Sequence, residues 1–215
     1  MTTQDSTRQL TSRTRLETFS DGVIAIAITL TVLSIGVPRG LPRSRVGSAI
    51  LDLIPELAIY LLSFAVIGSF WMSHHFALDR IERIDRRIML LNLAFLACIS
   101  LVPLVTNLIN QYPVSAAVMT YAAVMTLAAL SELAIWLHAE RHGLIAEEVT
   151  QEERVLRRSR LASIAGVFAA SIPIALLSPR AGQLVWVLAW VLGFLRVPLV
   201  PARRRRRGEP ASRRR

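Results

Sequence analysis

Long apolar blocks alternate with short charged stretches along this chain, a pattern typical of an all-α membrane protein. A bilayer core about 30 Å thick requires roughly 20 mostly apolar residues in a helix. Six blocks come close to that length, which predicts six transmembrane helices joined by short connections. We expect these spans at about residues 19–37, 54–73, 88–108, 114–137, 161–177 and 184–200.

The first block also fits a secretory signal peptide, because three arginines precede it. The block is longer than the apolar region of such a peptide, however, and no clear small-residue cleavage site follows it. We therefore interpret it as a retained span. Within later blocks, Pro103 and Pro173 predict kinks, which membrane helices tolerate. The charged stretch at about residues 140–160 predicts a short surface helix with opposite charges a few residues apart.

Charge predicts the orientation of the chain in the membrane. A net charge of +10 often indicates nucleic-acid binding, but here the arginines bracket apolar spans. If the N-terminus is inside, the cytoplasmic segments contain twenty arginines and the opposite loops contain four. The positive-inside rule then predicts cytoplasmic N and C termini, for a multi-pass protein of the cell inner (plasma) membrane.

This topology divides the chain into three regions. Residues 1–17 form a cytoplasmic N-terminus, residues 18–200 a six-helix transmembrane domain, and residues 201–215 an arginine-rich cytoplasmic tail that we expect to be disordered. Anionic lipid headgroups are the expected partner of the tail, because it follows the last span directly. A nucleic-acid-binding arm is the alternative that this position disfavours.

The first span has one distinctive face. At about 100° per residue, six positions fall within one arc of about 100°, and none of them is charged. These are Phe19, Gly22, Ile26, Thr29, Leu30 and Leu33. An apolar arc on a membrane helix most often serves for packing, so the arc alone does not indicate a pore.

Asp21 needs a partner, because an acid near the start of a membrane helix is costly. It lies about 140° from Ile26, outside the arc. Trp71, His74 and His75 end the second span at the same expected depth. We predict that Asp21 or the neighbouring Ser20 accepts a hydrogen bond from one of these rings.

The residues Arg15-x-x-x-Phe19-Ser20-Asp21, the run that continues to Ile26, and the later Trp71 and His74-His75 resemble the transmembrane protein 175 family of potassium channels. The resemblance covers essentially the whole chain, as a single six-helix repeat of the prokaryotic type. It implies a homotetramer whose first helix lines a central potassium pore, with no selectivity loop of the usual potassium-channel kind.

The resemblance also implies roles for individual residues. Ile26 falls on the hydrophobic constriction, Thr29 on a hydroxyl layer that contacts potassium transiently, and Leu33 on an outer hydrophobic layer. Gly22 and Leu30 complete the pore face. A structural network that holds the inner end of the bundle is implied for Arg15, Phe19, Ser20, Asp21, Trp71, His74 and His75.

Two other functions remain open from the sequence. A proton-coupled transporter would use Asp21, His74 and Glu132 as a relay, and a non-conducting membrane scaffold would use none of them. The sequence has no nucleophile–base pair, phosphate-binding glycine loop or cluster of metal ligands. We therefore predict no enzymatic activity, no cofactor and no metal beyond potassium itself.

Overall fold

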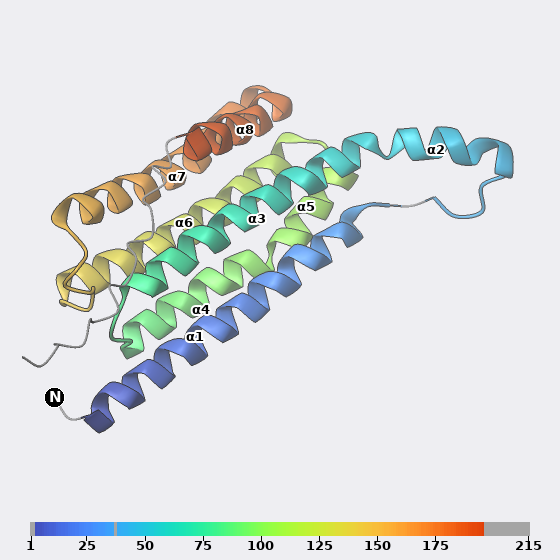
Figure 1. Cartoon of the computed structure of the whole chain (residues 1–215). Coiled ribbons are helices and arrows are strands. Elements are labelled where there is room, and N and C mark those ends of the chain that lie inside the picture. Colours follow the sequence, from blue (N-terminus) through green and yellow to red (C-terminus); the bar gives the residue numbers. More distant parts are fainter. Residues whose placement is uncertain (1–2, 37, 196–215) are drawn as a thin grey trace, which may run out of the picture.

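The computed structural model describes residues 3–36 and 38–195, which form a bundle of long helices (Figure 1). Most of the helices run nearly side by side, and α1 lies at the edge of the bundle opposite α7 and α8 (Figure 1). The elements are α1 (Thr3–Leu30), η1 (Thr31–Ser34), η2 (Arg43–Arg45), α2 (Val46–Asp52), α3 (Ile54–Arg80), α4 (Arg86–Ser100), α5 (Val102–Gln111), α6 (Ser115–Arg141), α7 (Gln151–Leu177) and α8 (Pro179–Leu195).

Five stretches of the described chain are long and apolar enough to span a membrane. They are Arg13–Ser34, Ile54–Arg80, Arg86–Gln111, Ser115–Arg141 and Gln151–Leu177. Five of the six expected spans are therefore found in the described chain. The sixth predicted span corresponds to α8, whose 17 described residues fall short of the roughly 20 that a span needs. Residues 196–200 of that span and the predicted tail, residues 201–215, lie outside the described part.

The third predicted span is broken into two helices, α4 and α5. The break is at Leu101, and Pro103 stands in the first turn of α5. Proline has no N–H to donate to the preceding turn and its ring crowds that turn, so the helix cannot continue regularly through it. The predicted kink is therefore present at Pro103, whereas Pro173 lies within the continuous helix α7.

The prediction of a separate surface helix at residues 140–160 is wrong. α6 continues to Arg141, and the charged residues from Glu152 onward form the first turns of α7. The side chain of Thr150 accepts a hydrogen bond from the backbone N–H of Glu153, and the Glu153 carboxylate accepts one from the N–H of Thr150. This capping box starts the helix ten residues before the apolar block begins at Leu161.

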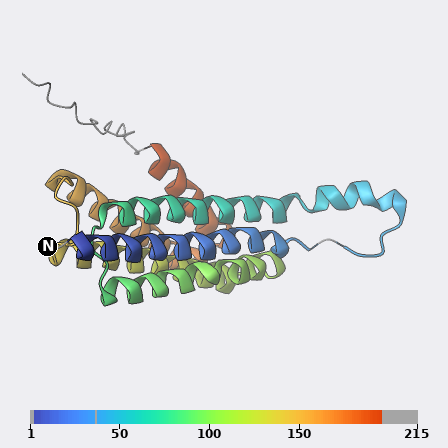
Figure 2. The same cartoon turned by 60° about the horizontal axis from the view of Figure 1, so that its bottom comes forward.

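One end of the bundle gathers segments that are far apart in sequence. The start of α1, the α3–α4 connection and the α6–α7 connection all lie there, whereas α2 projects beyond the other end (Figures 1 and 2). The two connections pair through one antiparallel bridge between Ile81 and Ile145, both buried. We call this end the N-terminal end of the bundle. It has a small hydrophobic core of its own, distinct from the main core.

Candidate functional site

The helix α1 turns one face toward the rest of the protomer and the opposite face away from it. Its buried positions recur every three or four residues: Ser20, Ile24, Ala27, and then Thr31 and Ser34 in η1. On a helix of about 3.6 residues per turn these positions form a single stripe. The stripe packs on α3, α4 and α5.

The six positions of the predicted arc are all exposed in the protomer. Ile26 is 60% exposed and Leu33 is 73% exposed, although both are large apolar side chains. The arc is centred about 130° around α1 from the buried stripe, so this protomer leaves most of it uncovered. Its exposure shows that packing within this chain does not explain the arc.

Thr29 places a hydroxyl between the apolar levels of Ile26 and Leu33. The hydroxyl donates to the backbone carbonyl of Ile26 at 2.9 Å, one turn earlier in α1. A hydroxyl oxygen that donates its proton in this way still has lone pairs to offer. Thr29 can therefore present an acceptor on the exposed face without leaving its own donor unpaired.

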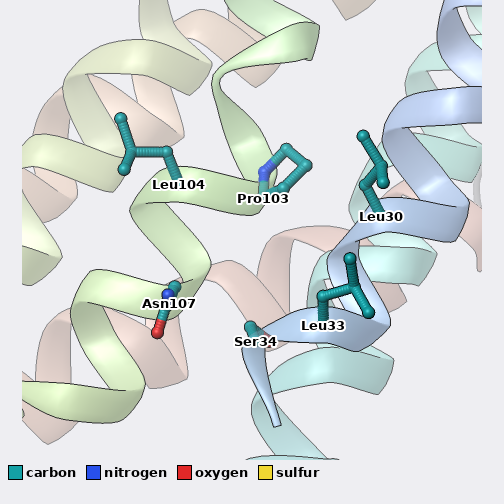
Figure 3. Close-up of a pocket in the computed structure, with 6 residues that line it drawn as sticks. All are labelled: Leu30, Leu33, Ser34, Pro103, Leu104 and Asn107. Atoms are coloured by element: carbon teal, nitrogen blue, oxygen red, sulfur yellow. The ribbon is translucent and has the colours of Figure 1, made fainter.

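A pocket of about 270 Å³ adjoins this face near the end of the bundle distant from the N-terminus. Figure 3 shows Leu30 and Leu33 on one wall, and Leu104 and Asn107 on the other. Ser34 and Pro103 complete the lining. The second wall belongs to α5, which the sequence did not associate with the arc.

Asp21 and Trp71 contact each other, as the sequence predicts. The indole Nε1 of Trp71 donates to Oδ1 of Asp21 at 2.9 Å and so connects α3 to α1. Ser20 instead faces α4, where its hydroxyl and the side-chain amide of Asn92 are hydrogen-bonded at 3.1 Å. Asn92 was missed in the sequence, although a polar side chain inside an apolar block is a signal that a buried partner exists.

His74 and His75 occupy different environments. His74 is 1% exposed, and its ring stacks on that of Phe95 with centroids 4.6 Å apart. His75 is exposed and stacks on Trp71 at 5.8 Å. Only Trp71 of the predicted ring cluster reaches Asp21.

Arg15 and Phe19, the first two signature positions, are exposed. The structure shows no hydrogen bond or ion pair from Arg15 to any residue that it describes. Arg13, two residues earlier, pairs with Asp79 of α3 at 2.7 Å and with Glu17 at 3.0 Å. The signature singled out Arg15, whereas the ion pairs are made by Arg13.

Glu132 is fully buried and pairs with α7, not with the predicted relay partners. Its Oε1 accepts from Arg157 at 3.0 Å and from the hydroxyl of Ser73 at 2.6 Å. Within the described residues, no hydrogen-bond chain links it to Asp21 or His74. The described part of the chain also has no group of three or more His, Cys, Asp or Glu residues that could hold a metal ion.

The contacts at the N-terminal end also include an acid–imidazole pair. Asp85 accepts from the backbone N–H of Ile88 at 2.8 Å, as the N-cap of α4, and lies 2.6 Å from Nε2 of His138. Partial burial of the Asp85 carboxyl raises its pKa, but the hydrogen bonds from His138 and Ile88 outweigh this effect and lower the pKa below its usual value.

Comparison with known proteins identifies the family. A sequence profile described as the endosomal/lysosomal potassium channel TMEM175 matches residues 15–103. A potassium channel of Streptomyces collinus is 39% identical over 136 residues, which cover 60% of this chain and 65% of that protein. A potassium channel of Chamaesiphon minutus is 35% identical over 146 residues, which cover 65% of this chain and 72% of that protein.

The three-dimensional fold agrees with the sequence match. The crystal structure of a lysosomal potassium-selective channel TMEM175 homolog from Chamaesiphon minutus superimposes with a TM-score of 0.75 at 28% identity. The superposition covers 86% of this chain and 98% of that one. This is a family of ion channels, not of enzymes. Because the profile, the sequence of the Chamaesiphon minutus channel and the overall fold all match, the chain belongs to the TMEM175 family.

Proposed function

We propose that this chain is one subunit of a potassium-permeable channel, in which α1 lines the ion path and conduction is passive. The observation that carries the proposal is the exposed, uncharged arc of α1, a face distinct from the buried stripe that packs on the other helices. The two bacterial relatives named potassium channels support potassium as the permeant ion.

A homotetramer provides the simplest cover for this face. Four copies of α1 around an axis would stack rings of Ile26, Thr29 and Leu33. A ring of isoleucine side chains can close a pore by excluding water, and threonine hydroxyls can replace part of the hydration shell of an ion. The arc has no charge, so in this proposal selectivity does not come from a ring of acids.

The arrangement of the bundle ends supports cytoplasmic termini. Four of the arginines counted as cytoplasmic, Arg80, Arg83, Arg86 and Arg87, belong to the end of α3, the α3–α4 connection and the start of α4, at the N-terminal end of the bundle. Arg43 and Arg45 lie at the opposite end, in η2. We place the protein in the plasma membrane, with the tail at residues 201–215 next to anionic headgroups.

The transporter alternative loses its structural basis, because its proposed relay residues do not form a connected chain. Asp21 bonds Trp71, His74 stacks on Phe95, and Glu132 pairs with Arg157. A relay would require these groups, or water between them, to exchange protons in sequence. A non-conducting scaffold would not account for the exposed, uncharged arc on α1.

Flux measurements distinguish the three functions. Purified protein in liposomes under a potassium gradient should carry downhill potassium flux with no coupling ion. Replacing Ile26 by Asn should raise this flux, because a polar ring wets the constriction. Leu127→Asn is the matched control: Leu127 is 56% exposed, close to the 60% of Ile26, but lies on α6.

The other outcomes have distinct meanings. Flux that requires a proton gradient would indicate the transporter, and folded protein without flux would indicate the scaffold. An equal rise in Leu127→Asn would remove the assignment of α1 as the pore helix.

A further inference from the structure

A buried ion pair connects three helices behind α1. Glu132 of α6 is 0% exposed, and Nη2 of Arg157 in α7 lies 3.0 Å from its Oε1. The guanidinium also contacts Ser73 of α3, through the backbone carbonyl and, at 3.3 Å, through the hydroxyl. The Ser73 hydroxyl donates to Glu132 at 2.6 Å, which closes the triangle.

This cluster meets α3 at the turn that also holds the pore helix. Ser73 follows Trp71 by two residues, so the two side chains point about 200° apart around α3. Trp71 reaches forward to Asp21 on α1, while Ser73 faces α6 and α7. His74, between the two helical faces, packs on Phe95 of α4. One turn of α3 is thus fixed from both sides.

An ion pair is a costly way to fix a helix in an apolar surrounding. Two well-packed apolar side chains can often replace a buried pair without loss of stability, whereas removal of one partner leaves a buried charge unpaired. The attraction between the two charges is therefore not a sufficient reason for an ion pair at this place. Its hydrogen bonds to the backbone and hydroxyl of Ser73 give it a directional role that apolar residues do not reproduce.

We propose that Arg157 and Glu132 are positioning residues for the ion path: they set the rotation and height of α3 at Ser73, so that Trp71 presents its indole to Asp21 of α1. This inference rests on the proposed function only through α1 as the conducting helix. Neither residue contacts the exposed arc, and each acts on it through α3.

The experiment compares single and paired replacements in detergent and in liposomes. Arg157→Met alone leaves Glu132 buried without its ion-pair partner, so it should lower both the melting temperature and the potassium flux. The double variant Glu132→Met, Arg157→Met leaves no unpaired buried charge. Its melting temperature should therefore be close to that of the unmodified protein. Because the bonds to Ser73 are still missing, its flux should stay about three- to tenfold below that of the unmodified protein.

Two further variants keep the test independent of folding. Arg157→Lys retains a positive charge beside Glu132, but a single ammonium cannot reproduce the guanidinium contacts, so the protein should fold and conduct less. Trp136→Phe is the control. The guanidinium lies 5.2 Å from the centroid of the Trp136 ring, whose N–H has no hydrogen-bond partner within the described residues. Because Trp136 is 1% exposed, the smaller ring should lower the melting temperature, but the flux should be kept, since Arg157 retains its contacts with Glu132 and Ser73.

A thermodynamic cycle provides a readout that does not need flux. Asp21→Asn should lower the melting temperature of the unmodified protein, and should lower it less in the Glu132→Met, Arg157→Met background, where Trp71 is no longer held in place. An equal loss in both backgrounds, or full flux in the paired variant, would overturn the inference. If the unmodified protein conducts no potassium, the proposed function is wrong. The melting temperatures of the cycle then still test whether Glu132 and Arg157 position Trp71 against Asp21.

Discussion

At the scale of single residues, Asp21 shows how one acid is accommodated at the start of a membrane helix. It lies beside the exposed arc, not on it, and accepts a hydrogen bond from Trp71. The contact satisfies the carboxylate and at the same time ties α1 to α3. Asp21 therefore acts, in our account, on the position of the ion path and not on the ion.

Replacing either partner of this contact should have a similar effect. Trp71→Phe and Asp21→Ala should each lower the unfolding free energy by about 1 kcal/mol, because each removes the same side-chain hydrogen bond. The two losses should not add when both changes are combined. Thermal unfolding in detergent measures this, and fully additive losses would show that the two side chains act separately.

Asp85 should make the stability depend on pH. Its pKa is lower in the folded protein, so the contribution is complete above the usual carboxyl pKa and is lost as the pH falls through the lowered value. Because Asp85 is partly exposed, we expect less than about 1 kcal/mol. Melting temperatures between pH 6 and pH 3 (about the carboxyl range) should fall more steeply for the unmodified protein than for Asp85→Asn.

The Asp85→Asn variant is a suitable comparison because asparagine is also a good N-cap. It keeps the cap of α4 and removes only the titratable charge. Parallel pH curves for the two proteins would mean that Asp85 is not the group responsible.

Some residue contacts could be predicted from sequence and others could not. The Trp71–Asp21 contact was predictable, since both side chains need polar partners and lie at matching depths in antiparallel spans. The partners Asn92 and Arg157 lie 72 and 84 residues from the groups they contact, Ser20 and Ser73. Such contacts depend on how helices pack side by side, which the periodicity of a single helix does not encode.

At the scale of elements, hydrophobic length predicted the helices well and their ends poorly. The apolar blocks correspond to α1, α3, α6 and α7, but α3 and α6 extend beyond the predicted ends into charged residues. A charged side chain does not end a helix, whereas proline, glycine and capping residues do. This is why the stretch after Thr150 joins α7, and why Pro103 divides α4 from α5.

The close packing of α8 against α7 depends on a glycine. A Cβ on Gly182 would lie 3.0 Å from the Cβ of Ala175 and 3.1 Å from Cγ1 of Val118. Gly182→Ala should therefore force α8 outward and lower the unfolding free energy by about 1–3 kcal/mol. Chemical or thermal unfolding of the purified protein measures the loss.

Gly166 provides the matched control within α7. A Cβ there meets nothing within 4 Å, so Gly166→Ala should raise the unfolding free energy by about 0.5–1 kcal/mol through helix propensity alone. Equal effects of the two substitutions would contradict the close approach of α8.

At the scale of the whole molecule, the exposed surface is the extensively apolar one that a membrane protein presents. Only 22–44% of the residues in the apolar window of each candidate span are buried within the protomer. Lipid can cover the remaining apolar side chains, but the arc on α1 differs from a lipid-facing surface in having Gly22 and Thr29 among its apolar residues. In our proposal, this is the face that a symmetric channel would gather around its axis.

The sequence predicted the class of the molecule and its family, while the sixth span is only partly described and the oligomer remains a proposal. Membrane helices are recognisable because the lipid core demands length and apolarity. The way in which subunits would meet depends on surfaces that only the folded protomer displays.

Accessibility of single cysteines tests the central claim, that the exposed face of α1 lines the ion path. Cys98 is the only cysteine of the chain, so Cys98→Ala provides a background without thiols. Single cysteines then replace three arc residues, Ile26, Thr29 and Leu33, or three buried residues, Ile24, Ala27 and Thr31. A water-soluble, positively charged thiol reagent is applied during potassium flux. We predict that flux is lost with the first three and retained with the second three. Retained flux after labelling at the arc, or equal loss at both sets, would contradict the account.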